Sequence, residues 1–441
     1  MDAIKNCDGL TTIRFATAFS KNERRNRPMP IDWQRIYDAL IKNISLHSMD
    51  IYVDHTEMFQ ILCHVLKRNH RIKTVNISAS NIREEASRHI YKALKFSSGL
   101  ENLSFCNAIL PVEIWRKISR GIARNTSLKR IEFRFGVYDE RSMNIICEAL
   151  TQNSHIESIT FNQPKLHETN INAITKILRN NTTLKSLEIR GVTINGIETL
   201  GEALKENSSL KKLSLKNCKL DHYTSGFDNS KAVRILISTY QPRVRQPQAT
   251  DTITSKRQSF ESFCDSLKVN TSLDELDLSG SAITDQSICS ISEVLTINTS
   301  LKTLRLCVNG TSQSRGWSSL MHSLARNDTL TRIDFGSEFV PGSKNSLLEM
   351  LRTNQAINNI INLENIVGDD YEEVQRAIEK NKLDQISNEK NSVALLKMMS
   401  MRQEQFFSIF PLETWFSIIE NFKFAGISTN YVNTFCDLLN V

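Results

Sequence analysis

A phrase of the form Asn-x-x-Leu-x-x-Leu-x-Leu recurs about every 28 residues through most of this 441-residue chain. Two clear copies begin at Asn181 and Asn270. A fixed period of this length predicts a solenoid, in which each repeat contacts only its neighbours. The first apolar residues of the copies are Leu10, Leu46, Ile72, Leu100, Leu128, Ile156, Leu184, Leu210, Leu273, Leu301, Leu330 and Ile357.

Each repeat predicts one strand and one helix. Residues 186–190 alternate polar and apolar side chains, as a strand with one buried face requires. Residues 197–204 place apolar side chains three and four positions apart, which indicates an amphipathic helix. One repeat cannot bury either face alone. We therefore expect the repeats to stack, with parallel strands inside an arc and helices outside.

An asparagine ends each predicted helix. Asparagine tolerates the left-handed backbone conformation better than most residues, and that conformation commonly stops a helix. We therefore expect left-handed backbone at Asn153, Asn181, Asn207, Asn298 and Asn327.

The run Leu210-x-x-Leu213-x-Leu215-x-x-Cys218-x-Leu220 matches the leucine-rich-repeat consensus. A period of about 28 residues that includes a full helix resembles the ribonuclease-inhibitor-like class of that family. Over residues 1–363 this resemblance implies an α/β fold, a right-handed βα horseshoe of about twelve repeats. Several copies lack the consensus Asn or Cys of the turn, so its side-chain hydrogen bond must be absent or replaced there. These copies carry Ser80, Ala108, Pro164, Val192 and Ser281.

The nine cysteines are scattered, and none forms a Cys-x-x-Cys pair. This pattern predicts free, packed thiols in a reducing compartment rather than disulfides or a zinc site. Residues 1–20 lack a signal-peptide pattern, and no stretch approaches the roughly 20 apolar residues of a membrane span. We expect a cytoplasmic protein with no membrane span, although these features do not separate cytoplasm from nucleus.

Motifs typical of enzymes are missing from the chain. It has no phosphate-binding loop, no Gly-x-Gly-x-x-Gly, no His-Glu-x-x-His and no Gly-x-Ser-x-Gly. We therefore expect no enzyme activity, cofactor, metal or small-molecule substrate. One member of the repeat class activates a small GTPase and carries a long acidic tail. Residues 369–441 are only mildly acidic, so a GTPase-activating role is less favoured.

Two insertions interrupt the repeats. The longer lies near residues 222–257 and carries six Lys or Arg against two Asp, and the shorter is Lys21–Asp32. Insertions in solenoids occupy loops on one face, often the binding face. Two interpretations stay open: a basic arm that holds an acidic partner, or a loop without function.

The strand residues that point inside the predicted arc are polar and charged, from Arg14 at one end to Asp334 at the other. Aromatic side chains are almost absent from this column, which argues against binding of single-stranded nucleic acid. Segregated charge instead favours a partner protein with complementary charge. The residues predicted to bind it are Arg130, Glu132, Arg134, Glu188, Arg190, Lys212 and Lys216.

The chain after the repeats is predicted to be helical, with capping helices over 364–404 and a further segment over 405–441. The run 410–422 resembles the opening of an F-box, which implies binding to Skp1, the adaptor of a cullin ubiquitin ligase. A similar phrase occurs inside a repeat helix at 110–118, so a hydrophobic cap is the other interpretation. The possible adaptor contacts are Pro411, Glu413, Trp415, Ile418, Ile419 and Phe422. An interaction scaffold is the preferred function, and a ligase substrate receptor is the alternative.

The two interpretations of the tail make opposite predictions for co-purification with Skp1. If the tail is F-box-like, the full chain co-elutes with Skp1 and a version that ends at Met401 does not. If the tail is a cap, neither version binds Skp1 and the shortened chain loses thermal stability.

Overall fold

The computed structural model describes residues 11–15, 33–53, 56–80, 82–136, 139–162, 168–191, 196–218, 220, 251–281, 283–306, 315–336, 344–362 and 371–385. The chain divides into two compact units, Met1–Val374 and Gln375–Val441. The second unit is described only where it takes part in the helix at 371–385.

Three predicted features fall wholly or mostly outside the described residues: the insertion Lys21–Asp32, residues 222–250 of the longer insertion, and the F-box-like segment 405–441 with all its possible adaptor contacts. The longer insertion differs from its prediction at one end. Residues 251–257 are not a loop, because they belong to helix α10 (Asp251–Val269). The domain boundaries after residues 363 and 404 stay predictions.

The described strands form one 12-stranded parallel sheet, and each strand lies beside the next one in sequence. This order confirms the α/β leucine-rich-repeat solenoid that the period predicts. The strands are β1 (Thr12–Phe15), β2 (Ser48–Val53), β3 (Thr74–Ala79), β4 (Asn102–Cys106), β5 (Arg130–Arg134), β6 (Ser158–Asn162), β7 (Ser186–Arg190), β8 (Lys212–Lys216), β9 (Glu275–Asp277), β10 (Thr303–Arg305), β11 (Arg332–Asp334) and β12 (Asn359–Ile361).

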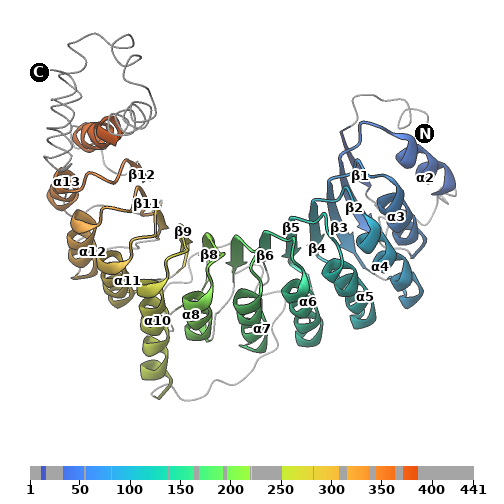
Figure 1. Cartoon of the computed structure of the whole chain (residues 1–441), viewed down its shortest axis with the longest axis horizontal. Coiled ribbons are helices and arrows are strands. Elements are labelled where there is room, and N and C mark those ends of the chain that lie inside the picture. The colour runs from blue at the N-terminus through green and yellow to red at the C-terminus, as the bar shows by residue number, and fades with distance from the viewer. Residues whose placement is uncertain are drawn as a thin grey trace, which may run out of the picture. The chain divides into compact units, whose positions relative to one another are not determined.

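Helices connect the strands and lie along one side of the sheet, which leaves the other side of the sheet without a helical layer (Figure 1). We call the strand side chains that point away from the helices the strand face. Besides α10 and the helix at 371–385, the helical elements are α2 (Trp33–Lys42), α3 (Thr56–Arg68), η1 (Glu84–Ala86), α4 (Ser87–Phe96), α5 (Val112–Ala123), α6 (Glu140–Gln152), α7 (Glu168–Asn180), α8 (Ile197–Glu206), α11 (Asp285–Ile297), α12 (Arg315–Arg326) and α13 (Lys344–Thr353).

The core lies between the sheet and the helices. The apolar residues of each repeat phrase, such as Leu187 and Ile189, are fully buried there. Phe105, Phe133 and Phe161 stack along the array with ring centroids 5.8 and 5.6 Å apart. Each fully buried side chain of this kind contributes roughly 1.5–3 kcal/mol to stability. Burial is therefore continuous from repeat to repeat, which is why one repeat is not stable alone.

The helix-ending asparagines are not left-handed, so that prediction is wrong. Asn153 has φ −80° and ψ 128°, and Asn207 and Asn298 are extended in the same way. Their side chains are buried instead of pointing to solvent. The helix ends because the asparagine makes hydrogen bonds that a helical residue could not make.

Asn181 shows how these bonds join three segments of chain. Its Nδ2 donates to the backbone oxygens of Leu150 (3.1 Å) and Asn153 (2.8 Å), at the end of the preceding helix α6. Its Oδ1 accepts from the backbone N–H groups of Thr183 and Leu184, both at 2.9 Å, just before strand β7. The last carbonyls of a helix have no partner within that helix. The asparagine therefore satisfies these carbonyls while it turns its own chain into the next strand.

This arrangement repeats along the array, and we call it the asparagine ladder. One repeat departs from it, because Ser97 takes the asparagine position. A Cβ atom on nearby Gly99 would lie 1.9 Å from the backbone oxygen of His70, so only glycine fits this close approach. The asparagines that donate to a carbonyl of the preceding repeat are Asn69, Asn125, Asn153, Asn181, Asn207, Asn270, Asn298, Asn327 and Asn354.

The turn that follows the strand varies as predicted from the missing consensus residue. At Ser281 the bond is replaced: its Oγ donates to the Leu215 oxygen (2.6 Å) and accepts from the Cys218 N–H (3.0 Å). Ala108 is buried and has no side-chain hydrogen-bonding group, so the bond is absent there. Pro164 and Val192 lie outside the described residues.

The residue just after several strands has left-handed backbone. Asn107 (φ 50°), Gly191 (φ 71°) and Asn217 (φ 52°) occupy this position, and Gly280 (φ 69°) holds the equivalent place in its repeat, three residues after the shorter strand β9. Asn and Gly are the residues that adopt it most readily. Phe135 holds the same position with φ 47°, although the left-handed conformation costs other residues roughly 1–2 kcal/mol. Its N–H donates to the Asn162 oxygen at 2.8 Å, just as the Asn107 N–H donates to the Arg134 oxygen at 2.9 Å.

We predict that Asn181→Ala lowers the free energy of unfolding by about 3 kcal/mol, because it leaves buried carbonyl and N–H groups without partners. The matched control is Asn180→Ala. Asn180 is exposed and donates only within its own helix, to the Lys176 oxygen (2.9 Å). Its replacement should change stability by less than about 0.5 kcal/mol. Chemical denaturation measures both, and equal losses would contradict the role of the ladder.

Candidate surface for partner binding

The sheet brings the seven sequence-predicted binding residues onto one surface. Registered pairing places Arg130, Ser158, Ser186 and Lys212 in one row across β5–β8. The next row on the strand face holds Glu132 and Glu188, and the row after it holds Arg134, Arg190 and Lys216. In both rows a neutral residue of β6 lies between the residue of β5 and the residue of β7. All seven share a face because side chains along a strand alternate between two sides.

Two of the arginines are held by glutamates of their own strands. Arg134 Nε lies 2.5 Å from Glu132 Oε1, and Arg190 Nε lies 2.7 Å from Glu188 Oε1. The hydrogen bond with Glu132 raises the pKa of Arg134. The glutamate side chains are only 22 and 16 % exposed, whereas the arginine side chains are 47 and 41 % exposed. Each carboxylate therefore fixes the position of an arginine side chain that is itself more exposed to solvent.

The two lysines of β8 pair with acidic residues of β9. Lys212 Nζ lies 3.0 Å from Glu275 Oε1, and Lys216 Nζ lies 3.0 Å from Asp277 Oδ2. Arg305 approaches the same Glu275 oxygen at 3.3 Å. The sequence-based set did not include Glu275 and Asp277. The insertion separates them from the lysines in sequence, so no local spacing indicates these pairs.

Asp277 is the most deeply buried anion of this surface. Burial by itself raises the pKa of its carboxyl group, but hydrogen bonds from Ser279 and the nearby Lys216 ammonium outweigh burial and lower the pKa overall. The Ser279 N–H donates to Asp277 Oδ1 at 3.0 Å. The carboxyl group is therefore charged at neutral pH and is held between two strands.

Charge on the strand face is not uniform. Strands β4–β8 carry five Lys or Arg and two Glu, a net charge of +3. Strands β9–β12 carry two Arg and three acidic residues, a net charge of −1. We call the outward side chains of β4–β8 the central strand face. It is the basic part of the surface.

Phe135 is a surface residue that the sequence-based set missed. It directly follows Arg134 at the end of β5, and 48 % of it is exposed. Alternation would place Phe133 and Phe135 on the same buried side, but the left-handed backbone turns Phe135 outward while Phe133 stays fully buried. A signal was present in the sequence, because the equivalent turn residue is Asn or Gly in four other repeats, at Asn107, Gly191, Asn217 and Gly280.

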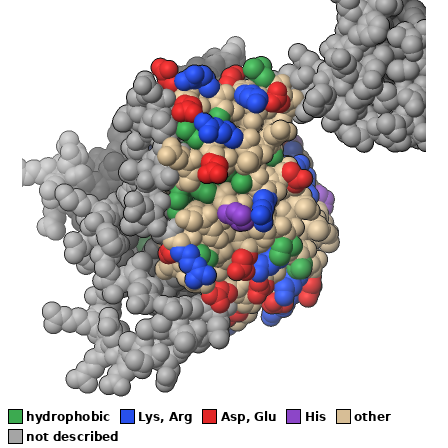
Figure 2. All heavy atoms as spheres, turned by 90° about the vertical axis from the view of Figure 1, so that its left-hand side faces the viewer, with side chains coloured by type: hydrophobic (Ala, Val, Ile, Leu, Met, Phe, Trp, Pro, Cys, Tyr) green, Lys and Arg blue, Asp and Glu red, His purple; other side chains and the backbone are tan. Residues whose placement is uncertain are grey.

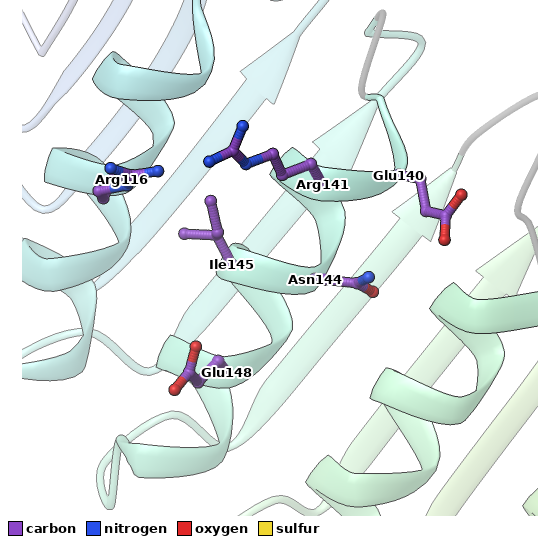
Figure 3. Close-up of a pocket in the computed structure, with 6 residues that line it drawn as sticks. All are labelled: Arg116, Glu140, Arg141, Asn144, Ile145 and Glu148. Atoms are coloured by element: carbon purple, nitrogen blue, oxygen red, sulfur yellow. The ribbon is translucent and has the colours of Figure 1, made fainter.

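The helix side offers a different kind of feature, an open groove of about 480 Å³ between α5 and α6. Figure 3 shows Arg116 and Arg141 directed toward a common space above Ile145, with Glu148 one turn further along α6. Such a groove is lined by exposed charges on both helices and encloses no apolar cavity. Figure 2 views the molecule from the left-hand side of Figure 1. On that face, hydrophobic side chains are scattered among charged ones rather than gathered in one patch.

Thiol chemistry is disfavoured at two buried cysteines. Cys63 and Cys147 are free and buried, and burial raises the pKa of Cys63 strongly and that of Cys147 to about 12. Such thiols are protonated at neutral pH, whereas a nucleophilic cysteine acts as the thiolate.

Within the described ranges, no three His, Cys, Asp or Glu side chains are placed to hold a metal ion. None of the helices described is long and apolar enough to cross a membrane.

No protein-family model and no curated protein matches the chain. Among solved structures, the yeast Rad7 and Elc1 complex matches 74% of this chain and 72% of that chain at 12% identity, with a TM-score of 0.42. Leiomodin-1 actin-binding site 2 matches 32% of this chain and 82% of that chain at 19% identity, with a TM-score of 0.29. The tropomodulin C-terminal domain of Caenorhabditis elegans matches 34% of this chain and 93% of that chain at 12% identity, with a TM-score of 0.28. Likenesses at this level do not bear on function.

We predict that Asp277→Asn lowers the free energy of unfolding at pH 7 by about 2 kcal/mol, because the amide lacks the negative charge that pairs with Lys216 and strengthens the hydrogen bond from Ser279. The folded-state pKa lies below the ordinary value of 3.8. The contribution is therefore full above about pH 3.8 and is lost as the pH falls through the folded value. The difference between the two proteins should shrink in acid. Asp265→Asn, in an exposed pair with Lys268, should cost less than about 1 kcal/mol at any pH.

Proposed function

We propose that this chain is a non-enzymatic interaction scaffold that binds a partner protein on the strand face. The observation that supports this most directly is the set of ion pairs on the central strand face. Arg134, Arg190, Lys212 and Lys216 are each held by a carboxylate. Charged groups that are already fixed lose less conformational entropy when they bind, so they favour specific recognition.

The form of the surface favours a protein over a small molecule. The charged rows run across several neighbouring strands, and pairing in register spaces adjacent strands by about 4.8 Å. Small-molecule sites are usually concave and mostly apolar. A row of separate charges is suited to a partner that extends over several repeats. The partner-binding residues are the seven predicted from the sequence, with Glu275 and Asp277 supporting the lysines.

The ligase alternative concerns a different part of the chain. Its possible Skp1 contacts all lie in 405–441, outside the described residues, and only the resemblance of 410–422 to an F-box favours it. It is compatible with a scaffold, because an adaptor-binding tail would leave the strand face free to hold a substrate. Co-purification with Skp1 tests it independently of the strand face.

We predict that a triple variant, Arg130→Gln, Arg134→Gln and Arg190→Gln, loses partner binding. Glutamine keeps a donor for Glu132 and Glu188 but removes the positive charge, so the fold is retained. The matched control changes Lys176, Arg179 and Lys205 to Gln, which removes three exposed cations from α7 and α8.

The measurement is quantitative mass spectrometry of proteins captured from source-cell extract at low and high salt. We expect proteins that bind the wild type and the control to be lost with the triple variant, and their capture to weaken as salt rises. If the triple variant captures the same proteins as the wild type, the strand face is not the binding surface.

A further inference from the structure

Phe135 is placed where the fold by itself would favour a different residue. Asn107, Gly191, Asn217 and Gly280 hold the equivalent turn position, and all of them have positive φ. In this conformation the turn N–H donates to the next repeat: the Asn107 N–H donates to the Arg134 oxygen at 2.9 Å and the Phe135 N–H to the Asn162 oxygen at 2.8 Å. A phenylalanine here is strained, since its Cβ crowds the backbone.

The side chain of Phe135 is much less buried than the other phenylalanines of this region. It is 48 % exposed, whereas Phe133 two residues earlier is fully buried in the aromatic stack. Asparagine or glycine would relieve the backbone strain and remove exposed apolar surface. Strained residues that persist in a structure concentrate at binding and active sites. The residue is therefore better explained by a contact with another molecule than by packing.

A second exposed apolar residue lies on the neighbouring turn. Ile109 is 54 % exposed and lies two residues after Asn107. The Asn107 N–H donates to the oxygen of Arg134, the residue before Phe135, so the two turns lie against each other. Both turns border the central strand face, whose strands carry a net charge of +3. Apolar anchors beside arginines are typical of protein interfaces.

We propose that Phe135, with Ile109 beside it, receives a large apolar side chain from an acidic segment of the partner protein. The carboxylates of that segment pair with Arg130 and the other cations of the central strand face. This inference rests on the proposed function and adds the chemistry of the partner. Charge sets the orientation of the segment along the rows, and the apolar contact sets its register.

The probe is a phage-displayed library of random peptides, selected on the full chain. We expect the enriched peptides to carry Asp or Glu close to a large apolar residue. A synthetic copy should bind Phe135→Asn at least about ten-fold more weakly than wild type. The control is Tyr52→Ser, which removes another exposed aromatic residue of the strand face (44 % exposed) from β2. It should leave the affinity unchanged.

A double-mutant cycle identifies the contact. Replacing the apolar residue of the peptide by Ala should weaken binding to the wild type, but it should have little further effect on Phe135→Asn. Additive losses would overturn the proposed contact. Enriched peptides without acidic residues, or no enrichment at all, would overturn the proposed class of partner.

Other outcomes separate this inference from the proposed function. If the triple glutamine variant loses peptide binding and Phe135→Asn does not, the strand face binds but Phe135 is not its anchor. If neither variant loses binding, both proposals fail.

Stability provides an independent check. Asn suits the left-handed backbone better than Phe, so the melting temperature of Phe135→Asn should equal or exceed that of the wild type. A clear decrease in melting temperature would show that Phe135 stabilises the fold, which would overturn the inference.

Discussion

The asparagine ladder is the interaction on which the rest of the repeat array depends. A helix end leaves carbonyl groups that cannot be satisfied within the helix, and stacking buries those ends where water does not reach them. The side chain of Asn181 resolves this for α6 by donating to Leu150 and Asn153, while its own oxygen receives the N–H groups that begin the next strand. Each asparagine thus joins the end of one repeat to the start of the next. Register is transmitted along the array because an amide held by several buried hydrogen bonds has very little freedom to shift.

That register creates the binding surface. Because each strand begins at the same point of its repeat, side chains far apart in sequence form straight rows, such as Arg130 and Lys212 in one row and Arg134 and Lys216 in another. Carboxylates within these rows hold the cations at fixed distances. Exposed ion pairs of this kind contribute little to stability. Their consequence is a patterned surface, with a basic centre over β4–β8 and an acidic excess beyond it, and this pattern supports the proposed binding of a protein.

Stability and surface chemistry conflict at the turn after β5. The backbone there favours Asn or Gly, as the equivalent turns at Asn107 and Gly191 illustrate. Phe135 adopts a left-handed conformation at an energetic cost and leaves an apolar ring half exposed, directly after Arg134 in the sequence. Local rules are most often broken where a protein binds something. The exception therefore carries more information about function than the regular turns around it.

The period of the repeat phrase by itself determined the solenoid, the alternation of strand and helix, and the face on which Arg130, Glu132, Arg134, Glu188, Arg190, Lys212 and Lys216 lie. These features follow from spacing along the chain, because strands and helices expose side chains with fixed periods. The sequence did not reveal the role of the asparagines, the pairing of Lys212 with Glu275 across the insertion, or the outward turn of Phe135. Only the tertiary structure decided these, because they depend on which carbonyl, carboxylate or backbone conformation the neighbouring repeat presents. Such partners are set by stacking between repeats, which the spacing within a single repeat does not encode.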